Sequence, residues 1–395
     1  MHFSAVIGVQ SWMEFASSSR DIMRSEAANL LDQRGQSPLN YAVQRGHNSA
    51  INWLCGQGAI VDDRSVFTAA VEGHVSCLKS LLHRGGNPNA RAYNLLTDEC
   101  EDETALWDTC GQGLEDVVQV LLDAGADPDE LSPPTPDLIE IWEYPTPAFV
   151  AACFGGSRHI VETLFLQTKD LHLYLDYCLD AAILRGHEAV IRFLLPKLSP
   201  VDQKSEREER FLSMAMCLNL SSSIVELLLD SFGSSADLVV HLGKDGPPLS
   251  IIEVPYYYEN RETVQMLLMR GATPPNRMLL TATKRNDAIL LEKFLQRDVD
   301  MTMSLHTAAK YGSLQAAKLL IAKGVAIDGT DGQSKTPLII AAESGFAEMV
   351  KLLLENGAST EARDDRGNNA RISAGAKGHA HAVRALDEFA LKMKN

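Results

Sequence analysis

The sequence lacks paired cysteines. It has 395 residues and seven cysteines, an odd number, and contains no Cys-x-x-Cys motif. Disulfide scaffolds and zinc knuckles use cysteines in pairs at short spacings, so neither is expected here. We therefore predict no metal site and a reducing compartment, the cytoplasm, with the nucleus as the alternative.

Long apolar runs and an excess of basic residues are missing as well. No uninterrupted apolar stretch approaches the roughly 20 residues that a membrane helix needs, and the first residues, MHFSAVIGVQSW, do not form a signal peptide. Lys and Arg number 36 against 52 Asp and Glu, a net charge of −16. Because phosphate binding needs a basic field, we expect neither a nucleic-acid partner nor a membrane partner.

The well-marked enzyme motifs are also absent. The sequence has no G-x-S-x-G, no H-E-x-x-H, no P-loop and no G-x-G-x-x-G. These absences exclude the best-marked hydrolases, zinc proteases, phosphate-loop enzymes and dinucleotide enzymes, and we expect no cofactor. An acid–base site without a motif remains the one route to catalysis.

What the chain does contain is a repeated pattern. Three clear copies read KTPLIIAAESGFAEMVKLLLENGASTEARD from Lys335, QSPLNYAVQRGHNSAINWLCGQGAIVD from Gln36 and ETALWDTCGQGLEDVVQVLLDAGADPD from Glu103. Weaker copies begin at Ser65, Thr146, Leu179 and Ser304. Each copy has an anchor, a Gly or its substitute, which we expect directly after a first helix: Gly46, Gly73, Gly113, Gly155, Gly186, Asn219, Asn286, Gly312, Gly345 and Gly378.

This pattern resembles the ankyrin repeat, whose period is about 33 residues and whose signature is T-P-L-H-x-A. The resemblance covers about residues 32–391 and implies an all-α solenoid of stacked helix-turn-helix units. One more copy fits between Asn219 and Asn286, so we expect about eleven repeats, with the divergent ones at about 128–300. Residues 1–31 are predicted to form an N-terminal helical cap, and about 369–391 a C-terminal capping repeat.

The chemistry of the repeat agrees with this prediction. With the Thr of Thr-Pro-Leu as position 1, a Thr or Ser there can cap the first helix, and the Pro at position 2 lacks an amide that would be unpaired anyway. The anchor at position 10 is expected in a left-handed turn, where glycine has no steric penalty. Five further glycines should stop second helices: Gly58, Gly85, Gly125, Gly324 and Gly357.

Histidines and cysteines occupy places that the repeat explains. His47, His74, His187 and His379 follow an anchor, and His306 lies in a Leu-His step. The resemblance implies that these histidines are structural and bond neighbouring backbone. Cys77 and Cys110 lie at core positions, so we expect buried and inert thiols.

Acidic residues are concentrated in one block. Residues 92–157 contain no Lys, Arg or His. A negative surface over repeats 3 and 4 could attract a basic partner or could serve only solubility. The block contains fifteen carboxylates: Asp98, Glu99, Glu101, Asp102, Glu103, Asp108, Glu115, Asp116, Asp123, Asp127, Asp129, Glu130, Asp137, Glu140 and Glu143.

The middle repeats are apolar where the family is commonly polar. The resemblance implies that positions 5, 8 and 9 line the concave groove. There the central repeats carry Val150, Cys153 and Phe154, then Ala181, Leu184 and Arg185, then Met214, Cys217 and Leu218. An exposed apolar groove floor invites association unless something covers it.

Two insertions could provide that cover. The first, Asp127 to Pro147, carries Trp142 and Tyr144, and the second, Gly243 to Glu262, carries three consecutive tyrosines, Tyr256 to Tyr258. They either repack divergent helices or form a half-enclosed aromatic pocket.

The leading hypothesis is a non-catalytic protein-interaction module that binds a partner with basic and apolar residues along the groove of repeats 3 to 7. The resemblance and the missing enzyme motifs favour it, although fold alone does not establish function. The candidate binding residues are Trp107, Asp108, Trp142, Tyr144, Val150, Phe154, Leu184, Arg185, Met214, Leu218 and Tyr256.

The alternative is an enclosed central pocket for an apolar small molecule, with acid–base isomerisation or cyclisation that uses no metal. The groups that could act there are Glu253, Asp176, Tyr177, His172, Tyr256 and Arg185. A ubiquitin-ligase adaptor ranks last, because the residues before 32 show no recognisable docking domain.

Overall fold

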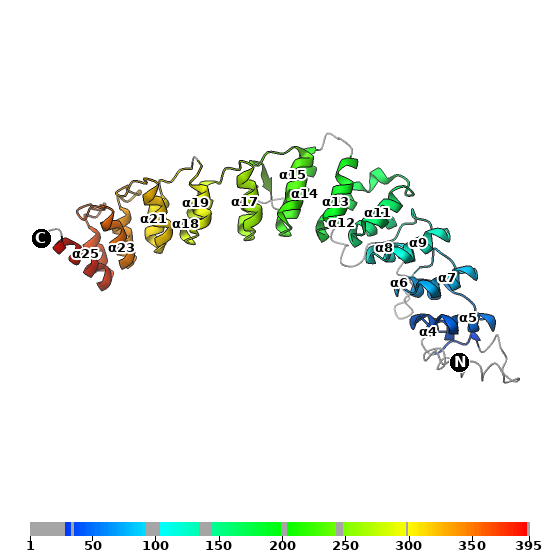
Figure 1. The fold of residues 1–395 in the computed structure, drawn as a ribbon. Helices are drawn as coiled ribbons and strands as arrows, with labels where there is room; N and C mark the ends of the chain where they lie inside the picture. The colour runs from blue at the N-terminus through cyan, green and yellow to red at the C-terminus, as the bar shows by residue number, and fades with distance from the viewer. Residues whose placement is uncertain are drawn as a thin grey trace. The chain divides into compact units, whose positions relative to one another are not determined.

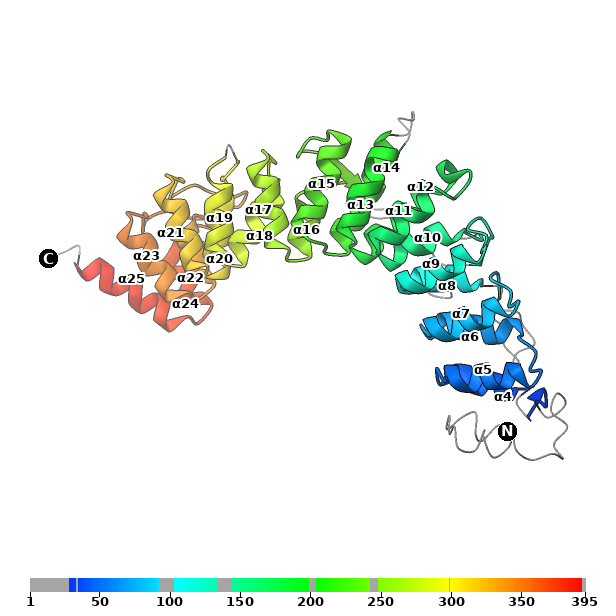
Figure 2. The ribbon, with the colours of Figure 1, turned by 45° about the vertical axis from the view of Figure 1, so that its right-hand side comes forward.

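Paired α-helices make up most of this protein, as Figure 1 shows. The computed structural model describes residues 28–32, 35–91, 103–133, 144–198, 204–241, 248–297 and 299–392, without the side chains of 204–206. The chain divides into two compact units, Met1–Phe232 (unit 1) and Gly233–Asn395 (unit 2). In each unit a first helix and a second helix alternate, and most of them pack on their counterparts in the next pair (Figure 2).

The helices of unit 1 stack in sequence order. Its first helices are α4 (Pro38–Gln44), α6 (Asp63–Val71), α8 (Ala105–Gln112), α10 (Ala148–Gly155), α12 (Leu175–Arg185) and α14 (Lys204–Cys217). Its second helices are α5 (Asn48–Gly56), α7 (Val75–His83), α9 (Glu115–Asp123), α11 (Arg158–Phe165), α13 (Glu188–Leu194) and α15 (Ser222–Phe232). Two short 3₁₀ turns, η1 (Leu171–Leu173) and η2 (Leu195–Lys197), flank α12 and α13.

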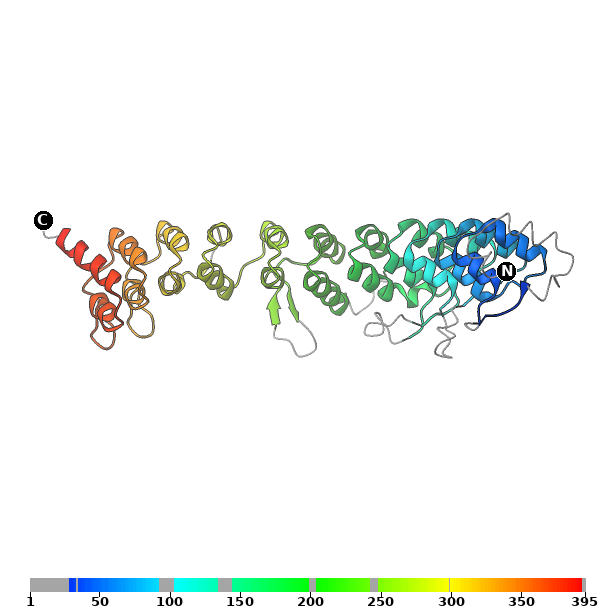
Figure 3. The same ribbon diagram turned by 90° about the horizontal axis from the view of Figure 1, so that it is seen from below.

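Unit 2 repeats this arrangement, with its two kinds of helix in two layers (Figure 3). The first helices are α16 (Glu253–Tyr257), α18 (Asn276–Lys284), α20 (Ser304–Tyr311), α22 (Pro337–Glu343) and α24 (Ala370–Ala376). The second helices are α17 (Arg261–Met269), α19 (Ala288–Phe294), α21 (Leu314–Ala322), α23 (Ala347–Glu355) and α25 (Ala380–Lys392). Before α16, β1 (Val239–His241) pairs antiparallel with β2 (Pro248–Ser250), Val240 opposite Leu249.

Side-chain caps start several of the first helices, as the sequence predicts for the clear copies. The Ser37 hydroxyl accepts a hydrogen bond from the Asn40 amide at 3.2 Å, and the Asn40 side chain accepts one from the Ser37 amide at 2.8 Å. In α8 and α22 the Thr104 and Thr336 hydroxyls accept a hydrogen bond from the Trp107 and Ile339 amides. Each cap satisfies a donor that the helix leaves unpaired, which fixes where the helix begins.

The predicted anchors lie in left-handed turns at nine of the ten positions, from Gly46 to Gly378. The prediction for the fourth copy is wrong, because Gly155 is still helical and Gly156 takes the turn with φ of +82°. Glu259, between α16 and α17, has φ of +59° and takes the equivalent place in the stretch where no anchor was recognised. The five glycines predicted to end second helices all have positive φ.

Gly155 has a different role, which is to let two helices approach closely. A Cβ at this position would lie 2.4 Å from the Cys110 carbonyl oxygen and 2.7 Å from that of Gly111. The backbone of α10 therefore rests directly on the end of α8. No residue with a side chain fits there without moving one helix.

In several junctions the residue that follows an anchor packs against the anchor glycine of the preceding pair. A Cβ on Gly156 would lie 2.4 Å from the His187 ring, and one on Gly345 would lie 2.7 Å from the His379 ring. Phe346 covers Gly312 in the same manner. The His187 ring also donates from Nε2 to the Phe154 carbonyl at 2.9 Å, as the structural role of this histidine predicts.

The buried thiols behave as predicted. Cys77 and Cys110 are fully buried, and burial raises the pKa of both thiols. Both therefore stay protonated and unreactive at neutral pH. The N-terminal cap expected over 1–31 lies, apart from residues 28–31, outside the described residues.

Candidate functional site

Five of the predicted binding residues come from three first helices that pack in sequence, α10, α12 and α14. Phe154, Leu184 and Met214 are half-buried, Arg185 is exposed, and Leu218, directly after α14, is 40% exposed. We call these five residues the first-helix face of unit 1.

One contact joins two members of this face. The Arg185 guanidinium lies over the Phe154 ring, 4.4 Å from its centroid, in a cation–π contact. The aromatic floor predicted at Phe154 is thus partly covered by the next pair of helices. Arg185 also gives this face a positive charge beside its apolar residues.

Two predicted binding residues, Trp107 and Val150, belong to the core. Trp107 is 4% exposed and Val150 is fully buried. The Trp107 indole Nε1 donates to the Thr146 hydroxyl at 3.3 Å. Because Gly156, directly after α10, is the anchor of this repeat, Val150 takes position 4, as Trp107 does, and this position faces inward.

The same shift corrects the predicted groove floor. The expectation that Val150, Cys153 and Ala181 line an accessible groove is wrong, because all three are fully buried. Cys153 falls at position 7 once Gly156 is the anchor, and Ala181 packs inside although it keeps position 5. Their bulk stabilises the stack and offers no surface to a partner.

The remaining predicted residues lie apart from this face. Asp108 on α8 is half-buried, and burial raises the pKa of its carboxyl, while a hydrogen bond from Gln112 at 3.2 Å partly offsets the rise. Tyr144 is 65% exposed, and Trp142 lies outside the described residues.

The acidic block, where it is described, covers a second helix and the loop after it. Glu115, Asp116 and Asp123 are exposed on α9. In the loop, Asp129 pairs with Lys169 at 3.4 Å and Glu130 pairs with Arg91. Exposed carboxylates of the block therefore lie both on α9 and, at Asp127, in the loop after it. Seven carboxylates of the block are outside the described residues: Asp98, Glu99, Glu101, Asp102, Asp137, Glu140 and Glu143.

Two of the candidate acid–base groups are held in ion pairs. Asp176 pairs with Arg207 at 2.8 Å, and Glu253, 1% exposed, pairs with Arg277 and accepts from the Ser250 amide at 2.9 Å. The buried Glu253 carboxylate, bound by a guanidinium and a backbone amide, therefore has a structural role at the start of α16. His172 is exposed in η1, and Tyr177 is half-buried on α12.

One buried acid was not recognised from the sequence. Asp180, one turn after Asp176 on α12, is 7% exposed and pairs with Arg210 at 3.0 Å. Burial raises the pKa of its carboxyl to about 7, the Asp176 charge adds to the rise, and Arg210 opposes it. The spacing of Asp176 and Asp180 on one helical face was the available signal.

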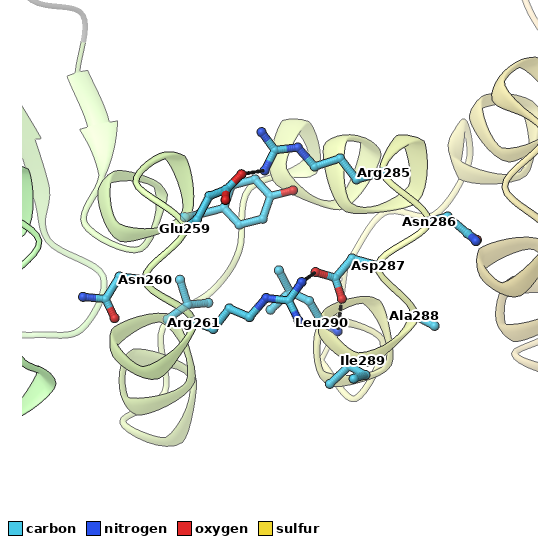
Figure 4. Close-up of a pocket in the computed structure, with 11 residues that line it drawn as sticks. Glu259, Asn260, Arg261, Arg285, Asn286, Asp287, Ala288, Ile289 and Leu290 are labelled. Atoms are coloured by element: carbon cyan, nitrogen blue, oxygen red, sulfur yellow. Dashed lines mark hydrogen bonds and ion pairs between the residues drawn. The ribbon is translucent and has the colours of Figure 1, made fainter.

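A hollow of about 470 Å³ lies in unit 2 between the pairs α16–α17 and α18–α19 (Figure 4). Tyr256, which the sequence singled out, is one of its lining residues, while Tyr257 and Tyr258 are exposed. The other lining residues are Glu259, Asn260, Arg261, Val264, Arg285, Asn286, Asp287, Ala288, Ile289 and Leu290. The hollow is half-open, its lining is polar and apolar in nearly equal parts, and it has one aromatic ring.

Charged side chains of the hollow pair across the junction. Arg261 contacts Asp287 at 2.8 Å, and Arg285 approaches Glu259 at 3.6 Å (Figure 4). One signal for this site was present in the sequence, an acid at the position after the anchor where several other repeats have His or Phe. Within the described residues, no three His, Cys, Asp or Glu side chains could hold a metal ion.

The family-level comparison agrees with this geometry. The model of the family described as ankyrin repeats (3 copies) matches residues 18–92, 256–364 and 305–391, more than half of the chain. The chain belongs to the ankyrin repeat family, and its stacked helix pairs form an all-α solenoid. Ankyrin repeats generally serve as protein-interaction modules.

No curated protein matches the chain. None of the helices in the described part of the chain is long and apolar enough to span a bilayer.

Proposed function

We propose that this protein is an interaction module that binds a partner protein through the first-helix face of unit 1. The observation that carries the proposal is the partial exposure of Phe154, Leu184, Met214 and Leu218, at positions where polar residues are usual. Apolar side chains that stay accessible on a rigid scaffold are the anchors that partner segments use.

The partner that fits this face has an apolar segment next to a basic stretch. Leu184 and Leu218 supply apolar contact area, and Arg185 can donate hydrogen bonds to a carbonyl or carboxylate of the partner. The exposed acids of α9 attract a basic stretch at a range of about 10 Å at moderate salt. Association should therefore slow as the salt concentration rises.

The test compares the wild-type protein with a Leu184→Asp, Leu218→Asp double variant. Both substitutions place a charge on the first-helix face without removing a fully buried side chain. Leu166→Asp is the matched control, because Leu166 is 85% exposed at the end of α11, a second helix of the same unit.

Proteins captured from the organism's own extract are compared for the three baits, and each captured protein is then purified and its affinity measured by calorimetry. We expect a partner whose affinity drops at least about tenfold for the double variant, the loss of a hot-spot contact, and stays unchanged for Leu166→Asp. Equal affinity for all three baits, with all three folded by circular dichroism, contradicts the proposal.

A further inference from the structure

The hollow in unit 2 lies at a junction where no ring follows the anchor. In the same unit Phe346 covers Gly312 and His379 covers Gly345. At the hollow the corresponding residue is Asp287, which follows the anchor Asn286. Its short side chain turns to Arg261 and to the Leu290 amide, so the space beside Glu259 stays open (Figure 4).

The two arginines of the hollow are not held equally. Arg261 makes a close ion pair with Asp287, whose other oxygen caps α19. Arg285 meets only a loose partner in the pair with Glu259, since the atoms are 3.6 Å apart and the Glu259 side chain is 77% exposed. A pair of this kind contributes little, so a better acceptor can displace Glu259 from Arg285.

Another polar group at the hollow, the Tyr256 hydroxyl, makes no hydrogen bond. Tyr256 is 6% exposed, and its hydroxyl is buried without a hydrogen bond. Burial raises the pKa of this phenol, which keeps it protonated and able to donate. The Arg285 guanidinium lies 5.5 Å from the centre of the Tyr256 ring, and both residues line the hollow. Buried hydroxyls are normally paired, and an unpaired one beside a hollow indicates a ligand.

We propose that this hollow binds a small organic molecule with one carboxylate and an apolar body. The carboxylate replaces Glu259 at Arg285 and accepts the Tyr256 hydroxyl proton in a hydrogen bond. The apolar body lies against Val264, Ala288 and Leu290. Because Glu259 and Asp287 already place two negative charges at the rim, a monoanion is preferred over a dianion such as a phosphonate.

The volume agrees with this class of ligand. Sites for small molecules span roughly 300–1,000 Å³, and the hollow has about 470 Å³. The site lies in unit 2, so it is separate from the protein-binding face proposed for unit 1.

The test titrates the full-length protein with 4-phenylbutyrate, its amide and 4-phenylbutylphosphonate at about pH 9, where the phosphonate is doubly ionised and Tyr256 keeps its proton. Binding is followed by ligand-observed NMR up to about 10 mM. We expect saturable binding of the carboxylate and at least about tenfold weaker binding of the amide, which loses the charge-assisted hydrogen bonds. The phosphonate should bind more weakly than the carboxylate.

Variants locate the binding. Tyr256→Phe and Arg285→Gln should each weaken 4-phenylbutyrate binding about tenfold, the effect of one hydrogen bond to a charged group. Arg366→Gln, an exposed arginine on a loop of the same unit, is the control and should change nothing. Tyr256→Phe should melt at or above the wild-type temperature, because it removes an unpaired buried hydroxyl, so weaker binding cannot be attributed to unfolding.

Three outcomes overturn the proposal. One is the absence of saturable binding of 4-phenylbutyrate, and another is equal affinity for the carboxylate and the amide. The third is unchanged affinity in both Tyr256→Phe and Arg285→Gln. Tighter binding of the phosphonate would show a site for a dianion in place of the monoanion proposed.

Discussion

The His187 ring lies against Gly156 and donates a hydrogen bond to the Phe154 carbonyl, so one side chain closes the end of the preceding first helix. Position 156 requires glycine for two reasons. The backbone has a left-handed φ of +82°, and the His187 ring occupies the space that a side chain would need. This relationship couples two neighbouring helix pairs and can be tested directly.

Gly156→Ala should destabilise unit 1 more than Gly125→Ala. Gly125 has φ of +90° and no atom within 4 Å of an added Cβ, so its substitution adds only backbone strain, about 1 kcal/mol. Gly156→Ala adds the displacement of His187 and the loss of its hydrogen bond, about 2 kcal/mol more. The free energies of unfolding come from urea titrations followed by circular dichroism, and equal losses would refute the coupling.

Alanine substitutions at Gly155 and Gly111 should change the free energy of unfolding in opposite directions. Both are helical, but a Cβ on Gly155 meets the Cys110 carbonyl oxygen at 2.4 Å, whereas one on Gly111 meets Ala151 at an ordinary 3.9 Å. Gly111→Ala should stabilise the protein by about 0.5–1 kcal/mol through helix propensity. Gly155→Ala should destabilise it by about 2 kcal/mol or more through overpacking. The same urea titrations decide, and a stabilising Gly155→Ala would show that α8 and α10 do not touch there.

Asp180 predicts a pH dependence of stability. Its folded-state pKa of about 7 lies above its ordinary value of 3.8, so between these values the folded chain holds a proton that the unfolded chain has lost. The free energy of unfolding should therefore fall as pH rises from about 4 to 7 and level off above, by up to about 4 kcal/mol. The groups around the carboxyl are Arg210, Asp176 and Cys178.

Asp180→Asn should remove this contribution. Relative to wild type, the variant gains stability between pH 5 and pH 8, because its side chain stays neutral throughout. Subtracting the two urea-derived curves cancels the titration of histidines common to both proteins. A difference that does not change with pH would mean that Asp180 is already ionised at pH 5.

The repeat architecture follows from the sequence because its signals are local. Helix caps and left-handed turns need particular residues at fixed places, such as Ser37, Thr104 and Thr336 at the caps. These residues can be recognised in a single sequence. Where two glycines are adjacent, as in Gly155 and Gly156, either could end the helix. The close approach to α8, which depends on tertiary packing, decides between them. That single-residue shift moved Val150 and Cys153 from the predicted groove into the core.

The site in unit 2 was predicted only in part, for a similar reason. Tyr256 attracted notice as one of three consecutive tyrosines, but its burial against Arg285 depends on a junction between helix pairs. Glu259 could not be recognised from the sequence as an anchor, because a glutamate rarely adopts a positive φ. Without that anchor, the acid at Asp287 could not be recognised as the residue that leaves a hollow where a ring would lie.

The uneven filling of the junctions has a mechanical consequence. Each pair of helices is fastened mainly to its neighbours, so a pulling force along the array opens the joint with the fewest packed atoms first. In unit 2 the joint beside Asp287 contains a hollow and has no ring after its anchor, so it should be among the first to open. A carboxylate-bearing molecule bound there would hold the two helix pairs together, and stretching the protein would release it.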